Sequence, residues 1–152
     1  MRAVIQRVNA AVLYCDGVYK SEIKKGLYVL LGVAKGDSEE DARVLAQKIS
    51  KLRIFTDEND KMNLSVNDVC GQVMVVSNFT LNANYAHGNR PDYFNSAEPS
   101  EANRLYEYFL SQIGGLVNGC ECGIFGADMR TKMSTDGPVT IVMDSSVLLK
   151  KG

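Results

Sequence analysis

The chain has 152 residues, 17 Lys and Arg against 18 Asp and Glu, and a formal net charge of −1. This length fits one domain, residues 1–152, whose core is large enough to be stable without disulfides or metal ions. The near-neutral charge excludes a whole-surface attraction to nucleic acid or to an anionic membrane, so any RNA contact has to rest on a local basic patch.

The first third of the chain alternates strand patterns with turns. Residues 3–8, 11–14 and 18–23 have strand character, and Asp16-Gly17 is the type of dipeptide that forms tight hairpin turns, because both residues accept a positive φ. Residues 27–33 are nearly all apolar, which predicts a strand that is buried on both faces.

Two helices are predicted in the middle of the chain. Ser38 is a suitable N-cap for the first, whose apolar residues recur at helical spacing as far as Leu52. The apolar strand 72–76 follows and runs into Ser77-Asn78-Phe79-Thr80-Leu81, which places Thr80 at the end of a buried strand. A long polar loop, 82–97, leads to the second helix, with Pro99 in its first turn.

The last part of the chain returns to strands. Residues 116–122 and 130–134 have strand character, and a final strand rich in β-branched residues is expected to begin at Pro138, where no ladder donor is needed. The fold class is therefore α/β, with a largely antiparallel, barrel-like β-sheet covered by two main helices.

Several kinds of site are not indicated. The four cysteines do not form two pairs at zinc-finger spacing, and we expect them to be reduced and mostly buried. His87 is the only histidine and has no orienting partner nearby in the sequence, so a catalytic triad is not indicated. Neither a glycine-rich phosphate loop of the Walker type nor a dinucleotide fingerprint is present. No window reaches the ~20 apolar residues of a membrane span, and the N-terminus lacks the apolar run of a signal peptide, so a cytoplasmic location without membrane contact is expected.

The remaining candidate chemistry lies around Thr80. Backbone amides at such a strand end can stabilise a developing oxyanion, and a hydroxyl there can orient a substrate. The alternative is a polar strand end that caps its own backbone. Gly137-Pro138 has a similar alternative, an ordinary turn that enters the last strand.

Three stretches together resemble the D-aminoacyl-tRNA deacylase family. The first is 75–81 followed by Gly88-Asn89-Arg90-Pro91, the second is Asp136-Gly137-Pro138-Val139-Thr140, and the third, between them, is 123–129. With the start of the chain, the resemblance covers essentially all of it. Two positions depart from the family pattern, because Asn78 stands where the family has glutamine and Thr135 where it has asparagine. These departures leave the fine positioning of the substrate open.

The resemblance implies a homodimer that hydrolyses the ester between a D-amino acid and the 3′ end of tRNA. It also implies hydrolysis of glycine mischarged on tRNA(Ala), and no role for DNA. It implies that the Gly137-Pro138 peptide is cis and reaches into the partner's site, where it rejects L side chains. It implies no metal and no organic cofactor. The residues implied in catalysis are Thr80, Phe79 (through its backbone amide), Ser77 and Asn78. Those implied in substrate binding and chiral selection are Gly137, Pro138, Thr135, Val139 and Thr140, with Arg90, Arg130 and Lys132 as candidate tRNA contacts.

Alternatives remain open. Either Thr80 Oγ1 is the nucleophile or the ribose 2′-hydroxyl of the tRNA assists hydrolysis of its own ester. We favour the second, because no base stands near Thr80 in sequence. The rival function classes are a small-ester or thioester hydrolase that uses Thr80 and a non-catalytic tRNA-binding module.

Overall fold

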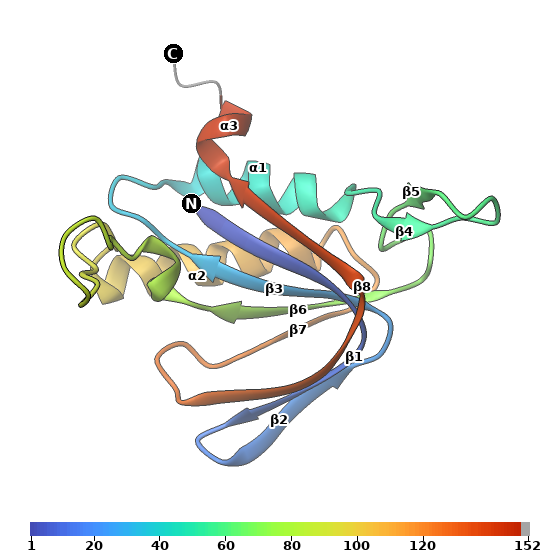
Figure 1. Cartoon of the computed structure of the whole chain (residues 1–152), viewed down its shortest axis with the longest axis horizontal. Helices are drawn as coiled ribbons and strands as arrows, with labels where there is room; N and C mark the ends of the chain where they lie inside the picture. Colours follow the sequence, from blue (N-terminus) through green and yellow to red (C-terminus); the bar gives the residue numbers. More distant parts are fainter. Residues whose placement is uncertain (150–152) are drawn as a thin grey trace.

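A strongly curved β-sheet forms the centre of the molecule, and its helices lie on one side of it (Figure 1). The computed structural model describes residues 1–149. The elements in chain order are β1 (Arg2–Cys15), β2 (Val18–Ile23), β3 (Gly26–Gly32), α1 (Glu39–Ser50), β4 (Phe55–Thr56), β5 (Met62–Leu64), β6 (Gln72–Ser77), the 3-10 helix η1 (Phe79–Asn82), α2 (Pro99–Gly114), β7 (Cys120–Cys122), β8 (Met129–Asp144) and α3 (Ser145–Leu149).

The long strand β1 organises the sheet. Its first half pairs with β3, from Arg2 opposite Gly32 to Val8 opposite Gly26, and its second half pairs with β2. The strand β8 accompanies β1 along its whole length, and both strands curve together in Figure 1. The two strands predicted at 3–8 and 11–14 are therefore one strand, because β8 supplies a continuous pairing partner across the break in the apolar pattern.

The other half of the sheet is parallel. β3 pairs in parallel with β6, and β6 pairs in parallel with the short β7. Three antiparallel pairings thus combine with two parallel ones in a barrel-like arrangement, which confirms the predicted fold class. The strand predicted at 116–122 is shorter than expected, since only Cys120–Cys122 pairs.

The helices cover the sheet with their apolar faces. α1 begins with a capping box. The Ser38 backbone N–H donates to the Asp41 side chain, and the Asp41 backbone N–H donates to the Ser38 side chain. α2 begins with Pro99, as predicted. The largest core cluster lies between these helices and the sheet; its fully buried members include Leu45, Phe55 and Phe109.

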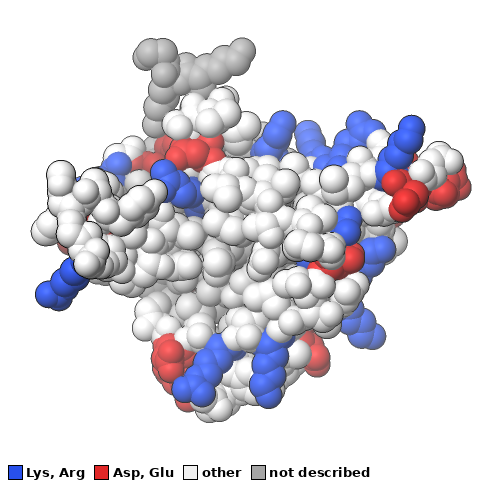
Figure 2. All heavy atoms as spheres, in the orientation of Figure 1, with Lys and Arg blue, Asp and Glu red and all other residues white. Residues whose placement is uncertain are grey.

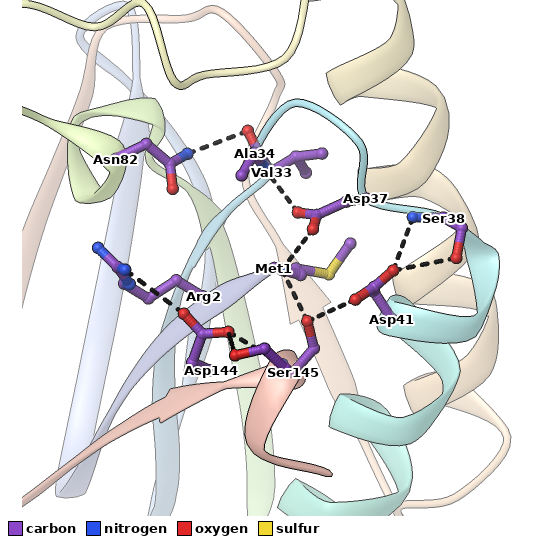
Figure 3. Close-up of polar contacts among 11 residues, drawn as sticks. Met1, Arg2, Val33, Ala34, Asp37, Ser38, Asp41, Asn82, Asp144 and Ser145 are labelled. Atoms are coloured by element: carbon purple, nitrogen blue, oxygen red, sulfur yellow. Dashed lines mark hydrogen bonds and ion pairs between the residues drawn. The ribbon is translucent and has the colours of Figure 1, made fainter. Parts of the chain in front are cut away.

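A polar network joins the start of β1 to α1 and to the end of β8 (Figure 3). The amino group of Met1 donates to Asp37 Oδ1 and to Ser145 Oγ, at 2.7 Å each. Ser145 Oγ in turn donates to Asp41 Oδ1. Burial alone would raise the pKa of Asp41, but hydrogen bonds from Ser145 and Ser38 hold it below its ordinary value. The network fixes the ends of β1, β3 and β8 against each other.

The prediction that the cysteines are mostly buried is wrong. Cys15 is buried, Cys120 and Cys122 are half-buried, and Cys70 is exposed in a turn. All four are free thiols, as expected. Burial raises the pKa of Cys120 to about 11, so this thiol is protonated at neutral pH.

Candidate active site

A cavity of about 450 Å³ opens where β6 ends. One wall is made by Ser77, Asn78 and Phe79, and the floor by residues that begin α2. The loop between β7 and β8 forms the opposite wall. The complete lining is Ser77, Asn78, Phe79, Ser96, Ala97, Pro99, Ala102, Phe125, Gly126, Ala127 and Met129. These side chains are mostly apolar, which suits an aromatic or aliphatic part of a ligand.

The segment after β6 is a helix and not the expected strand end. Phe79–Asn82 forms one turn of 3-10 helix, so Thr80 lies within η1 and outside the lining of the cavity. Asn78 N donates to Leu31 O at 2.8 Å, which ends the pairing with β3 and lets the chain turn. Asn82 is buried, and its Nδ2 donates to Val33 O at 3.0 Å, which fixes the other end of the turn.

η1 begins with the backbone amides of Phe79, which lines the cavity, and of Thr80, which follows it in the chain. The first amide of η1 that bonds within the helix belongs to Leu81, which donates to Asn78 O. The amides of Phe79 and Thr80 precede it and therefore have no acceptor in the helix. Ser96 Oγ donates to Phe79 O at 3.1 Å and holds the peptide plane of this residue from the other side. The arrangement can supply donors to an oxyanion.

The Thr80 hydroxyl is not activated as a nucleophile. Thr80 Oγ1 donates to Asn78 Oδ1, and an amide oxygen cannot take up the proton that a nucleophilic hydroxyl must lose. The Asn78 side chain is thus occupied with its neighbour two residues away. This contact gives Thr80 and Asn78 a shared role in the shape of η1.

The opposite wall depends on a buried tyrosine. Tyr106 Oη in α2 donates to Gly123 O at 2.9 Å and contacts Val75 O at 3.3 Å, so it joins the end of β6 to the loop that carries Phe125. The centroids of the Tyr106 and Phe125 rings lie 6.0 Å apart. Burial raises the pKa of Tyr106 far above its ordinary value, which keeps the hydroxyl a donor.

Most of the cavity lining has no local signal in the sequence. Ser96, Ala97, Pro99 and Ala102 lie near the start of α2, where a polar loop and a helix were predicted but no site. Phe125, Gly126 and Ala127 belong to the stretch 123–129, which contributes to the family resemblance without any role attached. That resemblance was the signal that pointed to this wall.

Gly137 and Pro138 lie far from the cavity of their own chain. The register pairs Thr135 with Val8 and Thr140 with Gln6, in the middle of β1. Val8 pairs with Gly26 at the start of β3, and Gly26 pairs with Gln72 at the start of β6, whereas the cavity lies where β6 ends. The Gly137-Pro138 peptide is cis. Pro138 does not begin a strand as predicted, because β8 continues through it. The strand tolerates the missing N–H because its outer edge is unpaired among the described residues and the pairing with β1 shifts register there.

The segment before Gly137 is held by a buried arginine. Arg7 Nε lies 3.1 Å from the Asp136 carboxylate and donates to Asp136 O, and Arg7 Nη1 donates to Ile54 O at 2.8 Å. Gly137 has a φ of +129°, and a Cβ added there would lie 2.6 Å from Val139 N. Only glycine fits this backbone without strain. Val139 is half-buried against the core, whereas Thr135 and Thr140 are exposed.

The three candidate tRNA contacts, Arg90, Arg130 and Lys132, are all exposed, and none of them forms a hydrogen bond with Thr80 in the described part of the chain. Arg90 lies in the loop before α2. Arg130 and Lys132 lie on β8 just after Met129, which lines the cavity, and Lys132 Nζ stands 5.5 Å above the Tyr14 ring. Figure 2 shows one face of the molecule, with Lys and Arg scattered around its margin and a broad uncharged centre.

The described residues, 1–149, contain neither a metal-binding cluster nor a membrane-spanning helix. No three His, Cys, Asp or Glu side chains of this part of the chain are arranged to hold a metal ion. None of the helices in the same range is long and apolar enough to cross a membrane.

Comparison with known proteins identifies the family. The sequence matches the family described as D-Tyr-tRNA(Tyr) deacylase over residues 4–144. The chain belongs to this family. It is 51% identical over 145 residues to the D-aminoacyl-tRNA deacylase of Caldicellulosiruptor saccharolyticus, a match that covers 95% of this chain and 97% of the relative. It is also 50% identical over 146 residues to the D-aminoacyl-tRNA deacylase of Thermosipho melanesiensis, with the same coverage. The enzyme class of the family is a hydrolase of the aminoacyl-tRNA ester.

Solved structures with the same fold include two informative relatives. A protein described as c-Myc DNA unwinding element binding protein is 35% identical, with a TM-score of 0.89 over 95% of this chain and 98% of that chain. A probable eukaryotic D-amino acid tRNA deacylase is 15% identical, with a TM-score of 0.79 over 94% and 98% of the two chains. The second likeness supports the deacylase fold alone, whereas membership of the family rests on the sequence matches.

Proposed function

We propose that this protein hydrolyses the ester bond of D-aminoacyl-tRNA and releases the free D-amino acid and the tRNA. Glycine mischarged on tRNA(Ala) is a second substrate, and L-aminoacyl-tRNA is rejected. The enzyme works as a homodimer in the cytoplasm, where tRNA is charged, and needs no metal or organic cofactor. Family membership supports the reaction class, and the geometry of the chain supports the finer assignments.

The observation that carries the proposal is the cavity at the end of β6. It brings Ser77, Asn78 and Phe79 together with Phe125 and Gly126, which are distant in sequence but belong to the stretches that resemble the family. The apolar walls accept the terminal adenosine. The amide of Phe79, a lining residue, and that of the following Thr80 donate to the ester carbonyl in this proposal.

The chemical step relies on the substrate's own hydroxyl. The ribose 2′-hydroxyl assists attack of a water molecule on the carbonyl carbon of the neighbouring ester, and the Phe79 and Thr80 amides stabilise the oxyanion that forms. The bond between the carbonyl carbon and the ribose oxygen then breaks, which releases the free amino acid and the 3′-hydroxyl of the tRNA. Thr80 Oγ1 keeps Asn78 in place and does not attack, because its hydrogen bond runs to an amide oxygen. Asn78, shorter by one methylene than the family's glutamine, performs this structural role within the turn.

The chiral filter comes from the partner subunit. Gly137 and Pro138 are exposed on a strand edge that is unpaired among the described residues, and an unpaired edge of 16 residues is a ready surface for association. In a two-fold dimer this segment enters the partner's cavity, where its bulk excludes L side chains. Thr135, Val139 and Thr140 shape the segment, and Arg90, Arg130 and Lys132 contact the tRNA.

Incubation with matched D- and L-tyrosyl-tRNA, followed by measurement of ester loss, tests the proposal. Loss of the D-amino acid alone is expected. Equal turnover of small free esters would favour the small-ester or thioester hydrolase. Binding of tRNA without ester loss would favour the non-catalytic module. Binding of DNA without any ester loss would favour the activity after which the 35% identical relative is named.

A further inference from the structure

A second hollow lies on the other side of η1 from the cavity. It encloses about 640 Å³, and its walls carry Arg2, Lys35, Asn82, Asn84, Tyr85 and Asn95. These walls are polar and basic with one exposed aromatic ring, in contrast to the apolar walls of the cavity. We call this hollow the η1 groove.

The η1 groove and the cavity share their partition. Phe79 lines the cavity and Asn82 lines the groove, and these residues are the two ends of η1. At about 2.0 Å per residue, a 3-10 helix of this length rises about 6 Å, roughly the length of one nucleotide. Asn95 and Ser96, adjacent in the chain, likewise face the groove and the cavity respectively. A polynucleotide whose last residue occupies the cavity therefore has its preceding residues beside the groove.

The walls of the η1 groove are held rigidly. Figure 3 shows Asn82 donating to the Val33 carbonyl and Arg2 linked to Asp144. Arg2 Nη1 donates to Leu81 O at 2.9 Å, and Lys35 N donates to Asn95 O at 2.9 Å. These bonds tie three separate chain segments into one surface before any ligand arrives.

Lys35 supplies the unpaired positive charge of the groove, whereas Arg2 is ion-paired with Asp144 and the Asp92 carboxylate accepts from Asn84 Nδ2 at 3.1 Å. Lys35 is exposed and forms no ion pair with any residue in the described part of the chain. The carboxylate of Asp37 is occupied by Met1 N and Ala34 N, at 2.7 Å each. Arg2 lies 3.4 Å from Asp144, but its side chain is 44% exposed and retains free donors.

Tyr85 adds a stacking surface. It is 82% exposed at the tip of the loop that follows η1. An exposed ring beside positive charge and side-chain amides is the combination that binds single-stranded nucleic acid, because bases stack on the ring and phosphates pair with the cations.

We propose that the η1 groove binds the single-stranded nucleotides that precede the aminoacylated adenosine of the tRNA. Lys35 and Arg2 neutralise the phosphates, and Tyr85 stacks on a base. This inference rests on the proposed function, since it takes the terminal adenosine to lie in the cavity. It assigns part of the RNA affinity to a local basic patch, which a chain of net charge −1 requires.

Binding of non-hydrolysable ligands tests the groove apart from catalysis. The two probes are D-tyrosyl-3′-amino-adenosine and an RNA hairpin with a single-stranded 3′ end that carries the same D-tyrosyl amide. Lys35→Ala and Tyr85→Ala are each expected to weaken hairpin binding about tenfold, equal to about 1.4 kcal/mol and within the range of one base–aromatic stack. Binding of the nucleoside stays unchanged. Lys35→Ala also lowers the salt dependence of hairpin binding by about 0.7 in the log–log slope, as for one lost phosphate contact, and Lys35→Arg restores it.

Lys61→Ala, a change of an exposed lysine in the distant β4–β5 turn, is the matched control and leaves both affinities as in the wild type. The proposal is overturned if the variants bind the hairpin as tightly as the wild type, or if they weaken hairpin and nucleoside equally. Failure of the proposed function would look different. The variants would show the expected losses in hairpin binding, but the wild-type protein would leave the ester of D-tyrosyl-tRNA intact.

Discussion

The two motif regions of this chain differ in how complete they are within one molecule. The region around Ser77–Thr80 closes onto Phe125 and Gly126 of the same chain and forms a walled cavity. The region around Gly137 and Pro138 is held from beneath by Arg7 but faces outward at the opposite end of β6. Gly137 and Pro138 are therefore fixed in an exposed position of β8, although they do not line the cavity of their own chain. This difference agrees with the proposed division of chemistry and selection between two subunits.

Gly137→Ala breaks the outward region and has the largest expected effect. The added Cβ would meet Val139 N at 2.6 Å, and a φ of +129° strains any L side chain. Strain of roughly 1–3 kcal/mol together with a displaced loop is expected to reduce ester loss from D-tyrosyl-tRNA roughly 10²–10³-fold, while the exposed position leaves the core folded. Steady-state kinetics on both enantiomers, with circular dichroism to check folding, measure this.

A complementation experiment then asks which chain the loop serves. Ala127→Trp fills the cavity and leaves Gly137 untouched, so each variant alone is inactive. When the two variants are co-expressed and pair at random, about half of the dimers are hybrids. If the site is shared across a two-fold dimer, each hybrid has one intact site of two, so about a quarter of wild-type activity returns. If the loop served its own chain, no activity would return.

The next largest effect separates Thr80 from the substrate's hydroxyl. Replacement of the terminal 2′-hydroxyl of the tRNA with hydrogen is expected to slow ester loss about a hundredfold, the lower end for a lost general acid–base group. Thr80→Ala removes only the hydrogen bond to Asn78 and is expected to retain activity within about tenfold. Single-turnover rates for the two cases decide the point. A dead alanine variant with an indifferent 2′-deoxy substrate would make Thr80 the nucleophile.

Periodicity was sufficient to predict most elements of the fold. The buried runs of β3 and β6, the Ser38 cap and Pro99 at the start of α2 are all local signals, and the structure confirms them. The continuity of β1 and of β8 was not predicted, because it depends on the pairing of the two strands with each other and not on the residues of either one. Pro138 was predicted to begin a strand because a proline inside a paired strand leaves one ladder position without an N–H donor. In the structure that donor is not needed, because the outer edge of β8 is unpaired among the described residues.

The candidate site was less accessible to sequence reasoning. Ser77, Asn78 and Phe79 carry polarity at the end of an apolar run, which is a visible signal, but the 3-10 turn that moves Thr80 off the cavity lining is not. Ala97, Phe125 and Ala127 are ordinary residues whose importance comes from position alone. The groove beyond η1 joins Arg2 to Lys35 and Asn82 across the fold, and no spacing in the sequence relates them.

Tyr106→Phe has the smallest expected effect and tests whether the cavity region acts independently of the region around Gly137 and Pro138. Loss of the hydroxyl leaves Gly123 O without its side-chain donor, whereas Val75 O keeps the bond from Gly123 N at 3.0 Å. The expected cost is about 1–3 kcal/mol in the free energy of unfolding. The wall that carries Phe125 loosens, so KM for D-tyrosyl-tRNA rises a few-fold, whereas the D/L ratio stays unchanged because the selecting loop belongs to the other region. Denaturant titration and steady-state kinetics measure the two quantities. Tyr108→Phe, on the same helix and half-buried, is the matched control. A change in the D/L ratio with Tyr106→Phe would show that the two regions are not independent.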